Sequence, residues 1–331
     1  MVSKTRCQTE DKSMQGILTA DIGGTYSRFA GFAISNDGAI SRLNTISFTT
    51  GSFNSFDDLI EEALIYAVPA SGSSWEEMVL AVPGPVREGV WARFPNVPWI
   101  ADMTNLRQKL PETEIHLIND FVAQAYACLL ETQLAKKMIE AGRSEDGGVI
   151  AVVGAGTGLG HCAIRKGAGD SICVIPSEAG HTAFPFCHED EDGFREYLMQ
   201  RTGSRYPHND LVASGPGLSH LHAWLTGEIL PPDQVVRRIG PDSETTEFFA
   251  RFYARACRNY VLGTLSTGGL FITGGVAIRN PFLVMNNSFR EEFIDTPHYR
   301  EILENIPISL VCDEDVGVIG AAWYGMINHR V

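Results

Sequence analysis

The chain has 331 residues, of which 44% are hydrophobic and 20% are charged, and its formal net charge is −14 at pH 7. This length is enough to bury two cores of ordinary domain size, which excludes a single small module. The negative charge and the lack of any run of Lys and Arg argue against nucleic acid and anionic membrane as partners. Seven scattered cysteines without a C-x-x-C pair favour neither a disulfide framework nor a zinc site, and indicate reduced thiols in the cytoplasm. No apolar run approaches the length of a membrane span.

The first regular element follows a polar stretch. Residues 1–15 have no apolar h-region and are predicted to be a disordered tail. From residue 16, GILTADIGGTYSRFAGFAI predicts two strands joined by a Gly-Gly-Thr turn, and the pattern returns near residue 148 as GVIAVVGAGTGLGHCAIR. Two such hairpins, each opening a stretch of alternating strands and helices, predict a duplicated architecture with two halves facing one cleft.

The stretch between the hairpins contains two further strands. EEMVLAVPGPV predicts a strand that closes on Pro and Gly, and IHLIND predicts a strand that leads into the helix FVAQAYACLLE. Asp120 stands at this strand-to-helix junction. An ionised carboxylate near a core needs partners or a function, so Asp120 either caps the helix or takes part in chemistry.

The second half ends in regular elements as well. TEFFARFYARACRNYVLGTLS repeats aromatic residues every four positions and predicts an amphipathic helix whose aromatics pack in the core. The strand GLFITGG and the closing helix GVIGAAWYGMI follow. Between the second hairpin and these elements, the polar segment from FCHEDEDGFREY to PHNDLVASG predicts loops that alternate with short helices.

The glycine turns do not match the common nucleotide-binding fingerprints. GAGTGLG has Leu159 where a G-x-G-x-x-G motif needs glycine, and the sequence after it is strand-like instead of helical. No G-x-x-x-x-G-K-[ST] motif is present. Turns that carry a hydroxyl, as at Thr25 and Thr157, can instead direct backbone N–H and O–H groups at phosphate oxygens. Asp21 either hydrogen-bonds its own turn or orients Mg²⁺ and its water ligands. A third turn, TGGV at 273–276, could border a nucleotide.

Taken together and in this order, the segments resemble the sugar kinases of the actin-like ATPase superfamily, and most closely the bacterial glucokinases of the hexokinase family. The matching segments, from residue 17 onward, are DIGGTYSR, LAVPGPV, FPNVPW, LINDFVAQAYA, GAGTGLG, PSEAGH, SGPGL and FITGGV. The resemblance implies an α/β chain with the duplicated actin-like ATPase (ribonuclease H-like) fold, in which two α/β domains flank a ligand cleft. The small domain would comprise residues 16–130 and the C-terminal helix at about 316–331, and the large domain residues 131–315.

The same resemblance implies an ATP-dependent glucose kinase that makes glucose 6-phosphate in the cytoplasm, a reaction of glycolysis. Asp120 would be the general base on the 6-hydroxyl, and Asp21 would hold Mg²⁺ through water. The positions that match the sugar site are Asn119, Asp120, Gly158, Glu178, His181 and Asp210. The positions that match the nucleotide site are Asp21, Gly23, Gly24, Thr25, Gly156, Thr157, Gly274 and Gly275. The expected partners are hexose and ATP, and the family also allows a homodimer.

One position departs from the family. A second sugar-binding Glu is expected four residues before the Ser of SGPG, and Asp210 stands there. Its shorter side chain must reach the sugar by a backbone shift, through water, or not at all. A kinase for mannose, fructose or an amino sugar therefore stays an alternative, as does a sugar-sensing protein without turnover. The sensor is disfavoured because Asp21, Thr25, Asp120 and Thr157 are all present. The related branch with a zinc site after the G-H pair is less similar, since Cys187 is the single cysteine there.

Overall fold

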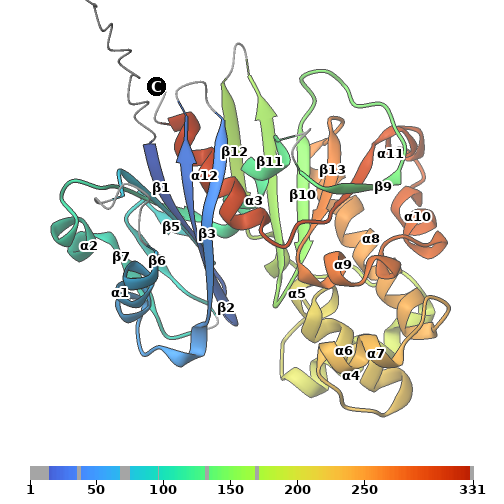
Figure 1. The fold of residues 1–331 in the computed structure, drawn as a ribbon. Helices are drawn as coiled ribbons and strands as arrows, with labels where there is room; N and C mark the ends of the chain where they lie inside the picture. The colour runs from blue at the N-terminus through green and yellow to red at the C-terminus, as the bar shows by residue number, and fades with distance from the viewer. Residues whose placement is uncertain are drawn as a thin grey trace, which may run out of the picture. The chain divides into compact units, whose positions relative to one another are not determined.

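The computed structural model describes residues 15–35, 39–67, 75–95, 97–130, 134–167 and 171–328. The predicted tail over residues 1–15 lies outside them, apart from Gln15 at the start of the first strand. The chain divides into two compact units, Met1–Asp120 with Ala321–Val331, and Phe121–Gly320. We call them unit 1 and unit 2. The predicted domain boundaries at residues 130 and 316 stay predictions, and each unit is described by itself (Figure 1).

Unit 1 is built on a mixed sheet. Among the described residues it has five strands in the order β3-β2-β1-β4-β8. Their bounds are β1 (Gln15–Ile22), β2 (Tyr26–Ile34), β3 (Ile40–Thr49), β4 (Glu77–Val82) and β8 (Glu114–Asn119). β1 and β2 form the first predicted hairpin, whereas β4 and β8 run parallel to β1. Every residue of β4 is buried, as expected for a central strand covered on both faces.

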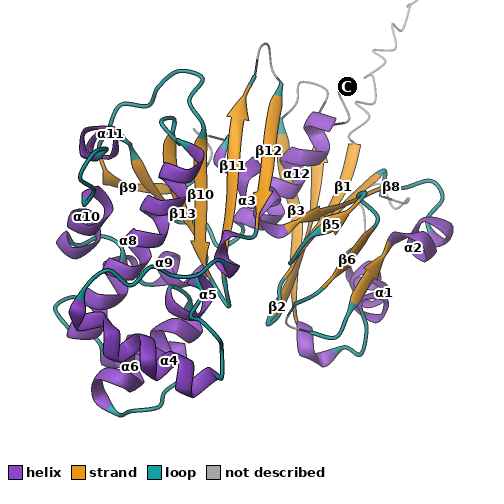
Figure 2. Cartoon of the chain, turned by 180° about the vertical axis from the view of Figure 1, so that it is seen from behind, coloured by secondary structure: helices purple, strands orange, loops and turns teal. Residues whose placement is uncertain are grey.

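Smaller elements complete unit 1. They are the turn η1 (Thr50–Ser52), α1 (Phe56–Tyr66), α2 (Met103–Lys109) and an antiparallel sheet of the short strands β5 (Val86–Arg87), β6 (Trp91–Arg93) and β7 (Ile100–Asp102). Side-chain caps begin both helices: Ser55 accepts from the N–H of Asp58, and Asp102 from the N–H of Thr104. Figure 2 shows β6 and α2 in this unit.

Unit 2 carries the second hairpin. In the part of the chain that the structure describes, its sheet has six strands in the order β12-β11-β10-β13-β14-β9. Their bounds are β9 (Lys136–Glu140), β10 (Ile150–Ala155), β11 (Leu159–Lys166), β12 (Ile172–Ser177), β13 (Gly269–Thr273) and β14 (Ile308–Val311). β10 and β11 form the predicted hairpin, and β13 and β14 continue parallel to β10.

α8 and α3 lie on opposite faces of this sheet. The bounds of the helices of unit 2 are α3 (Asp120–Cys128), α4 (Asp192–Thr202), α5 (Asn209–Val212), α6 (Gly215–Thr226), α7 (Pro232–Arg238), α8 (Glu244–Thr264), α9 (Gly275–Arg279), α10 (Asn287–Ile294) and α11 (Arg300–Asn305), with turns η2 (Ala179–His181), η3 (Glu189–Glu191) and η4 (Pro281–Leu283). The last helix, α12 (Val316–Asn328), begins in unit 2 and ends in unit 1. Alternate residues of β10 point to opposite sides: Ala151 and Val153 lie in the core that includes α8, and Val152 in the core that includes α3.

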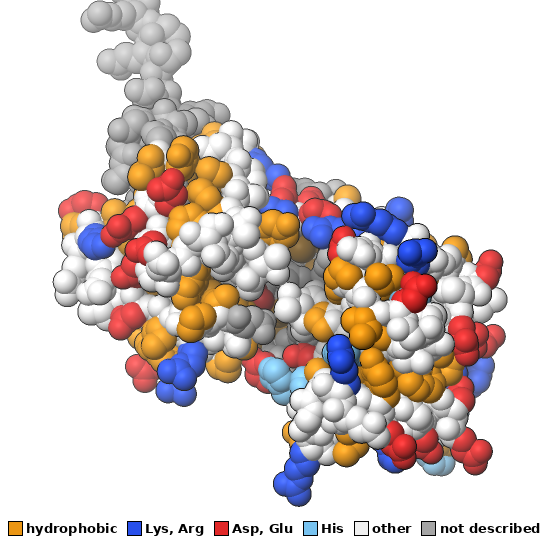
Figure 3. Space-filling view, turned by 90° about the horizontal axis from the view of Figure 1, so that it is seen from below, with side chains coloured by type: hydrophobic (Ala, Val, Ile, Leu, Met, Phe, Trp, Pro, Cys, Tyr) orange, Lys and Arg blue, Asp and Glu red, His pale blue; other side chains and the backbone are white. Residues whose placement is uncertain are grey.

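α8 confirms the predicted amphipathic helix, because its aromatic side chains Phe248, Phe252 and Tyr260 are buried. It also buries a charge. Arg255 is fully buried and pairs with Glu191 (Nη1–Oε2, 2.6 Å) and Glu292 (Nε–Oε1, 2.8 Å), which holds the chain before α4 and the helix α10 against α8. Within the described residues, no helix is both long enough and apolar enough to span a bilayer. On the face in Figure 3, Lys and Arg side chains lie in small groups among acidic ones.

Candidate functional site

Polar residues gather at one edge of the unit 1 sheet. β1, β4 and β8 run parallel in register, with Asp21 opposite Ala81 and Val82 opposite Asn119. Their carboxyl ends therefore reach the same edge. This places the first glycine turn, the VPGP segment at 82–85 and the Asn119–Asp120 pair along that edge, where open α/β sheets bind their ligands.

Asn119 orients the carboxylate of Asp120. Its Nδ2 donates to the carbonyl oxygen of Gly84 at 3.1 Å and to Oδ1 of Asp120 at 3.0 Å. Gly84 has a φ of 82°, and an added Cβ would lie 3.1 Å from the carbonyl oxygen of Arg93, so the turn that holds Asn119 requires glycine. Asp120 itself begins α3, where the positive end of the helix dipole favours an ionised carboxylate.

The first glycine turn is fastened by a residue that the sequence did not single out. Gly23 N–H donates to Tyr26 O at 2.9 Å, which closes the turn. The hydroxyl of Thr50 donates to Gly23 O at 2.7 Å and pairs with the Ser27 hydroxyl at 2.8 Å, while Thr50 N–H donates to Thr25 O at 2.9 Å. Thr50 is buried, and its hydroxyl and N–H hold the carbonyl groups of Gly23 and Thr25 in place. Thr25 is left exposed.

The second and third glycine turns meet in unit 2. β10 and β13 are parallel neighbours, so the turn at Gly156–Gly158 and the turn at Gly274 and Gly275 leave the sheet at the same edge. Gly274 has a φ of 83°, and an added Cβ would lie 2.4 Å from Ala155 O. The backbone of Ala155 is thus too close to Gly274 to leave room for a side chain there. Thr157, at the tip of the second turn, is exposed.

The predicted sugar residues of unit 2 form one cluster. His181 lies between two carboxylates, with Nε2 3.7 Å from Oε2 of Glu178 and Nδ1 3.6 Å from Oδ2 of Asp210. His181 and Glu178 are more than half exposed, whereas the side chain of Asp210 is 20% exposed. Burial raises the pKa of Glu178, an effect that His181 opposes and Asp210 reinforces.

Asp210 is held in place by the second glycine turn. Its Oδ1 accepts the N–H of Leu159 at 2.9 Å. An added Cβ on Gly158 would lie 2.9 Å from Oδ2 of Asp210, and one on Gly180 would lie 2.2 Å from Oδ1. The carboxylate therefore fills the space that these two glycines leave open. It lies between the turn and the PSEAGH segment, where its charge faces His181.

Two neighbours of Asp210 escaped the sequence analysis. The side-chain amide of Asn209 donates to Ala179 O and to Thr182 Oγ1, both at 2.9 Å, and so fixes the loop that carries His181. The ring of His208 lies beside that of His181, with 5.5 Å between ring centroids and a tilt of 55° between the ring planes. The polar run HND was the available signal, but only Asp210 in it matched a family position.

The predicted residues thus fall into separate groups. Gly158, Glu178, His181 and Asp210 come together in unit 2, where the turns at Gly156 and Gly274 also meet. Asn119 and Asp120 share the carboxyl edge of unit 1 with the first glycine turn, at Asp21, Gly23, Gly24 and Thr25.

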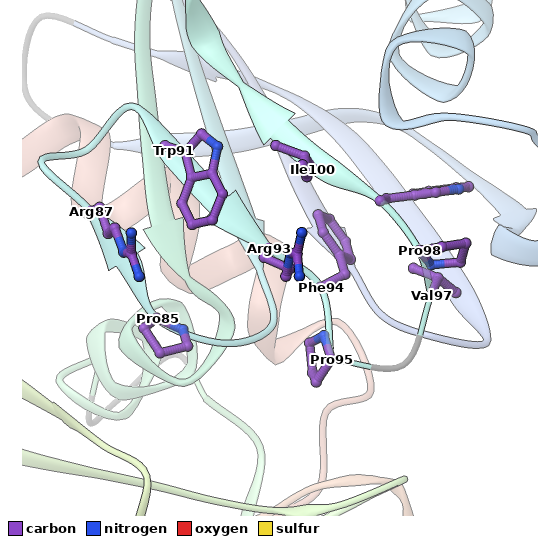
Figure 4. Close-up of a pocket in the computed structure, with 10 residues that line it drawn as sticks. Pro85, Arg87, Trp91, Arg93, Phe94, Pro95, Val97, Pro98 and Ile100 are labelled. Atoms are coloured by element: carbon purple, nitrogen blue, oxygen red, sulfur yellow. The ribbon is translucent and has the colours of Figure 1, made fainter.

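Unit 1 also has a surface pocket of about 760 Å³ beside the short strands β5, β6 and β7 (Figure 4). Arg87, Arg93 and Trp91 contribute to its lining, and the guanidinium of Arg87 lies 4.8 Å from the ring centre of Trp91. Of the described residues that line it, none was predicted as a site residue. Pro85 connects it in sequence to Gly84, the acceptor of the Asn119 amide.

Comparison with known proteins shows to which family the chain belongs. The sequence model of the glucokinase family matches residues 18–327. The chain belongs to the glucokinase family. The glucokinase of Trichormus variabilis is 29% identical over 92% of this chain and 97% of its own. A solved glucokinase from an Antarctic psychrotroph is 25% identical with a TM-score of 0.77, covering 96% of this chain and 100% of that one. The glucokinase of Balamuthia mandrillaris, solved in complex with glucose, is 21% identical with a TM-score of 0.77, covering 96% and 94%.

These matches confirm the predicted family, the predicted actin-like ATPase fold and the predicted enzyme class, an ATP:glucose phosphotransferase. They also explain the two glycine-rich hairpins, each at the start of one half of the duplicated fold.

Proposed function

We propose that this glucokinase uses Asp120 as the general base that accepts the proton of the glucose 6-hydroxyl. The observation that carries the proposal is the hydrogen bond from Asn119 Nδ2 to Asp120 Oδ1, at the end of β8 and the start of α3. Phosphoryl transfer depends mainly on positioning, because the loose transition state leaves little covalent work to the protein. A carboxylate that a neighbouring amide orients can align the hydroxyl and take its proton as the bond forms.

The phosphates of ATP would lie on the turns at Gly23–Thr25 and Gly156–Gly158, with the adenosine towards Gly274 and Gly275. The support is the geometry of these turns: glycine allows the backbone to approach closely, and Thr25 and Thr157 expose hydroxyls beside it. Asp21 supplies a carboxylate at the edge that carries the first turn, and oxygen donors of this kind suit Mg²⁺. When bound there through water, Mg²⁺ would neutralise charge on the phosphates.

The sugar would be read by Asn119, Gly158, Glu178 and His181. A carboxylate and an imidazole that are more than half exposed and 3.7 Å apart offer hydroxyl groups both acceptors and donors. A site that hydrogen-bonds each hydroxyl rejects an analogue that lacks one, since its own groups are then left unpaired. Asp210 would belong to the same sugar site, held beside His181 by the bond of its Oδ1 to the Leu159 N–H.

A kinase for another hexose is the second candidate, and the position of Asp210 favours keeping it. The family Glu would reach one methylene further than Asp210. A hydroxyl that this Glu would bind therefore has a weaker partner here. A cytoplasmic location and a homodimer belong to the same proposal, and rest on the family resemblance alone.

The test is the release of ADP from Mg²⁺–ATP with glucose, mannose, fructose, glucosamine and N-acetylglucosamine, beside a control without sugar. We expect strong turnover with glucose. Turnover with another hexose alone would move specificity to the surroundings of Asp210. Sugar binding without ADP release would show a sensor and contradict the general-base role of Asp120.

A further inference from the structure

Three potential metal ligands converge beside the predicted sugar loop. His181 ends the turn η2, His208 precedes α5, and Asp210 lies within α5. One ligand atom from each of the three lies within 4.8 Å of the other two. Nδ1 of His181 and Oδ2 of Asp210 are 3.6 Å apart, and the two imidazole rings are 5.5 Å apart between centroids.

These separations suit a tetrahedral metal ion. Zinc binds imidazole nitrogen and carboxylate oxygen at about 2.0–2.2 Å, so two of its ligand atoms stand roughly 3.4 Å apart. The His181–Asp210 pair already meets this spacing at 3.6 Å. The ligand atom of His208 lies within 4.8 Å of the other two and must move closer when a metal binds. Two imidazoles and one carboxylate are a donor set for Zn²⁺ and not for Mg²⁺, which prefers oxygen ligands.

The backbone that carries the three ligands is fixed. Residues Ala183 and His208 form an isolated β-bridge, and the Asn209 amide holds Thr182 Oγ1 at 2.9 Å. Oδ1 of Asp210 is bonded to Leu159 N–H, which leaves Oδ2 facing His181. The two segments that carry the ligands are therefore already joined to each other before a metal binds.

His208 gives an independent sign that the cluster is incomplete. Its Nδ1 is buried and has no hydrogen-bond partner among the described residues. Buried polar atoms are nearly always paired, so an unpaired imidazole nitrogen in a cluster of ligands calls for a missing partner. Neutral imidazole is also the form that binds metals.

We propose that His181, His208 and Asp210 form a site for a divalent transition-metal ion such as Zn²⁺, and that the metal and the hexose exclude one another. The exclusion rests on the proposed function, which assigns His181 and Asp210 to the sugar site. A bound ion occupies both side chains and takes water as its fourth ligand. Zinc then acts as an inhibitor that competes with sugar, and Mg²⁺–ATP binding is unaffected.

The first experiment measures the metal site without any substrate. Untagged protein is titrated with Zn²⁺ by calorimetry, and His208→Ala is compared with His188→Ala. His188 is the matched control, because it also lies near a carboxylate, with Nε2 3.6 Å from Glu292, and follows the exposed thiol of Cys187. We expect His208→Ala to weaken the tightest Zn²⁺ binding by at least about tenfold, and His188→Ala to leave it unchanged. Equal affinity in wild type and His208→Ala would overturn the site.

The second experiment tests exclusion. Saturating glucose should weaken Zn²⁺ binding to the wild type, and Zn²⁺ should raise the glucose KM without lowering kcat. His208→Ala should keep its glucose KM while losing this inhibition. Zinc binding that glucose does not change, in a protein that phosphorylates glucose, would overturn the exclusion. Failure of the proposed function is distinguishable, because the titration without sugar reads the metal site whether or not the protein has kinase activity.

Discussion

Asp210 and Leu159 stand 51 positions apart in the chain, yet Oδ1 of Asp210 accepts the backbone N–H of Leu159 at 2.9 Å. The bond joins α5 to the residue that follows the second glycine turn. Because Gly158 and Gly180 have no Cβ, the carboxylate of Asp210 lies close to the backbone at both positions. The short side chain at position 210 thus reaches the second glycine turn directly.

Asp210→Glu tests this contact. The added methylene moves the carboxylate from its position beside Gly158, Gly180 and the Leu159 N–H, so the neighbouring loops must shift, and strain of this kind typically costs about 1–3 kcal/mol. We expect a lower melting temperature and a glucose KM that rises or stays unchanged. Steady-state kinetics and thermal unfolding of the wild type and the variant decide it. A lower glucose KM would show that the short side chain is a handicap.

Asp120→Asn separates catalysis from helix capping. Asparagine caps helices about as well as aspartate but cannot accept the proton, so kcat should fall by about 10²- to 10⁴-fold while sugar affinity changes little. Asp102→Asn is the matched control, because Asp102 caps α2 through Thr104 N–H. It should retain normal turnover. Near-normal kcat for Asp120→Asn would remove Asp120 from the mechanism.

Gly274→Ala tests the third glycine turn. The φ of 83° is strained for alanine, and the new Cβ would lie 2.4 Å from Ala155 O, so the backbone must move. We expect a loss of about 2 kcal/mol or more in unfolding free energy and a higher ATP KM. Gly240→Ala is the control in the same unit, since no atom lies within 4 Å of its added Cβ. An unchanged ATP KM would place the adenosine elsewhere.

Thr50→Val tests the support of the first turn. The change keeps the shape of the side chain but leaves Gly23 O and the Ser27 hydroxyl without their partner, which typically costs about 1–3 kcal/mol. The ATP KM should rise, because the turn is less well fixed. Thr49→Val, at an exposed neighbouring position, should change neither stability nor kinetics. If both variants behave alike, Thr50 does not position the turn.

The pH dependence of sugar binding follows from Glu178. Burial raises the pKa of this carboxyl above its ordinary 4.5. The ionised form, which accepts hydrogen bonds from hydroxyls, is therefore lost at a higher pH than in an exposed glutamate. The glucose KM should rise as the pH falls through the raised pKa and stay flat above it. Glu178→Gln should abolish this acid limb. An acid limb that persists in the variant would assign it to another group.

Local patterns were enough to predict much of the fold. The two hairpins, the strand ending at Asn119 and the amphipathic helix α8 each carry their signal within about twenty residues, through alternation or a four-residue repeat. The order of the motifs then supplied the family. The small sheet of β5, β6 and β7 was missed, because strands of two or three residues show no periodicity.

The rest depends on contacts across the chain. Thr50 supports Gly23 from 27 positions away, and Asn209 reaches Thr182 from the same separation. No spacing rule within a sequence connects such pairs, because only the packing of the elements brings them together. The same holds for the Asp210 carboxylate: the sequence showed that this side chain is short, but not that it is bonded to the Leu159 N–H.

The buried pairs of Arg255 with Glu191 and Glu292 have a further consequence. Arg255 Nη1 also donates to Pro185 O at 3.0 Å, and Glu191 Oε2 accepts the N–H of Cys187 at 3.0 Å. The ten residues that follow His181 are thus tied to a charge with no access to water. An insertion or deletion there would shift Glu191 away from Arg255 and leave the buried guanidinium without one of its two carboxylate partners. These buried ion pairs therefore fix the number of residues between His181 and Glu191. The length of this connection is as constrained as its composition.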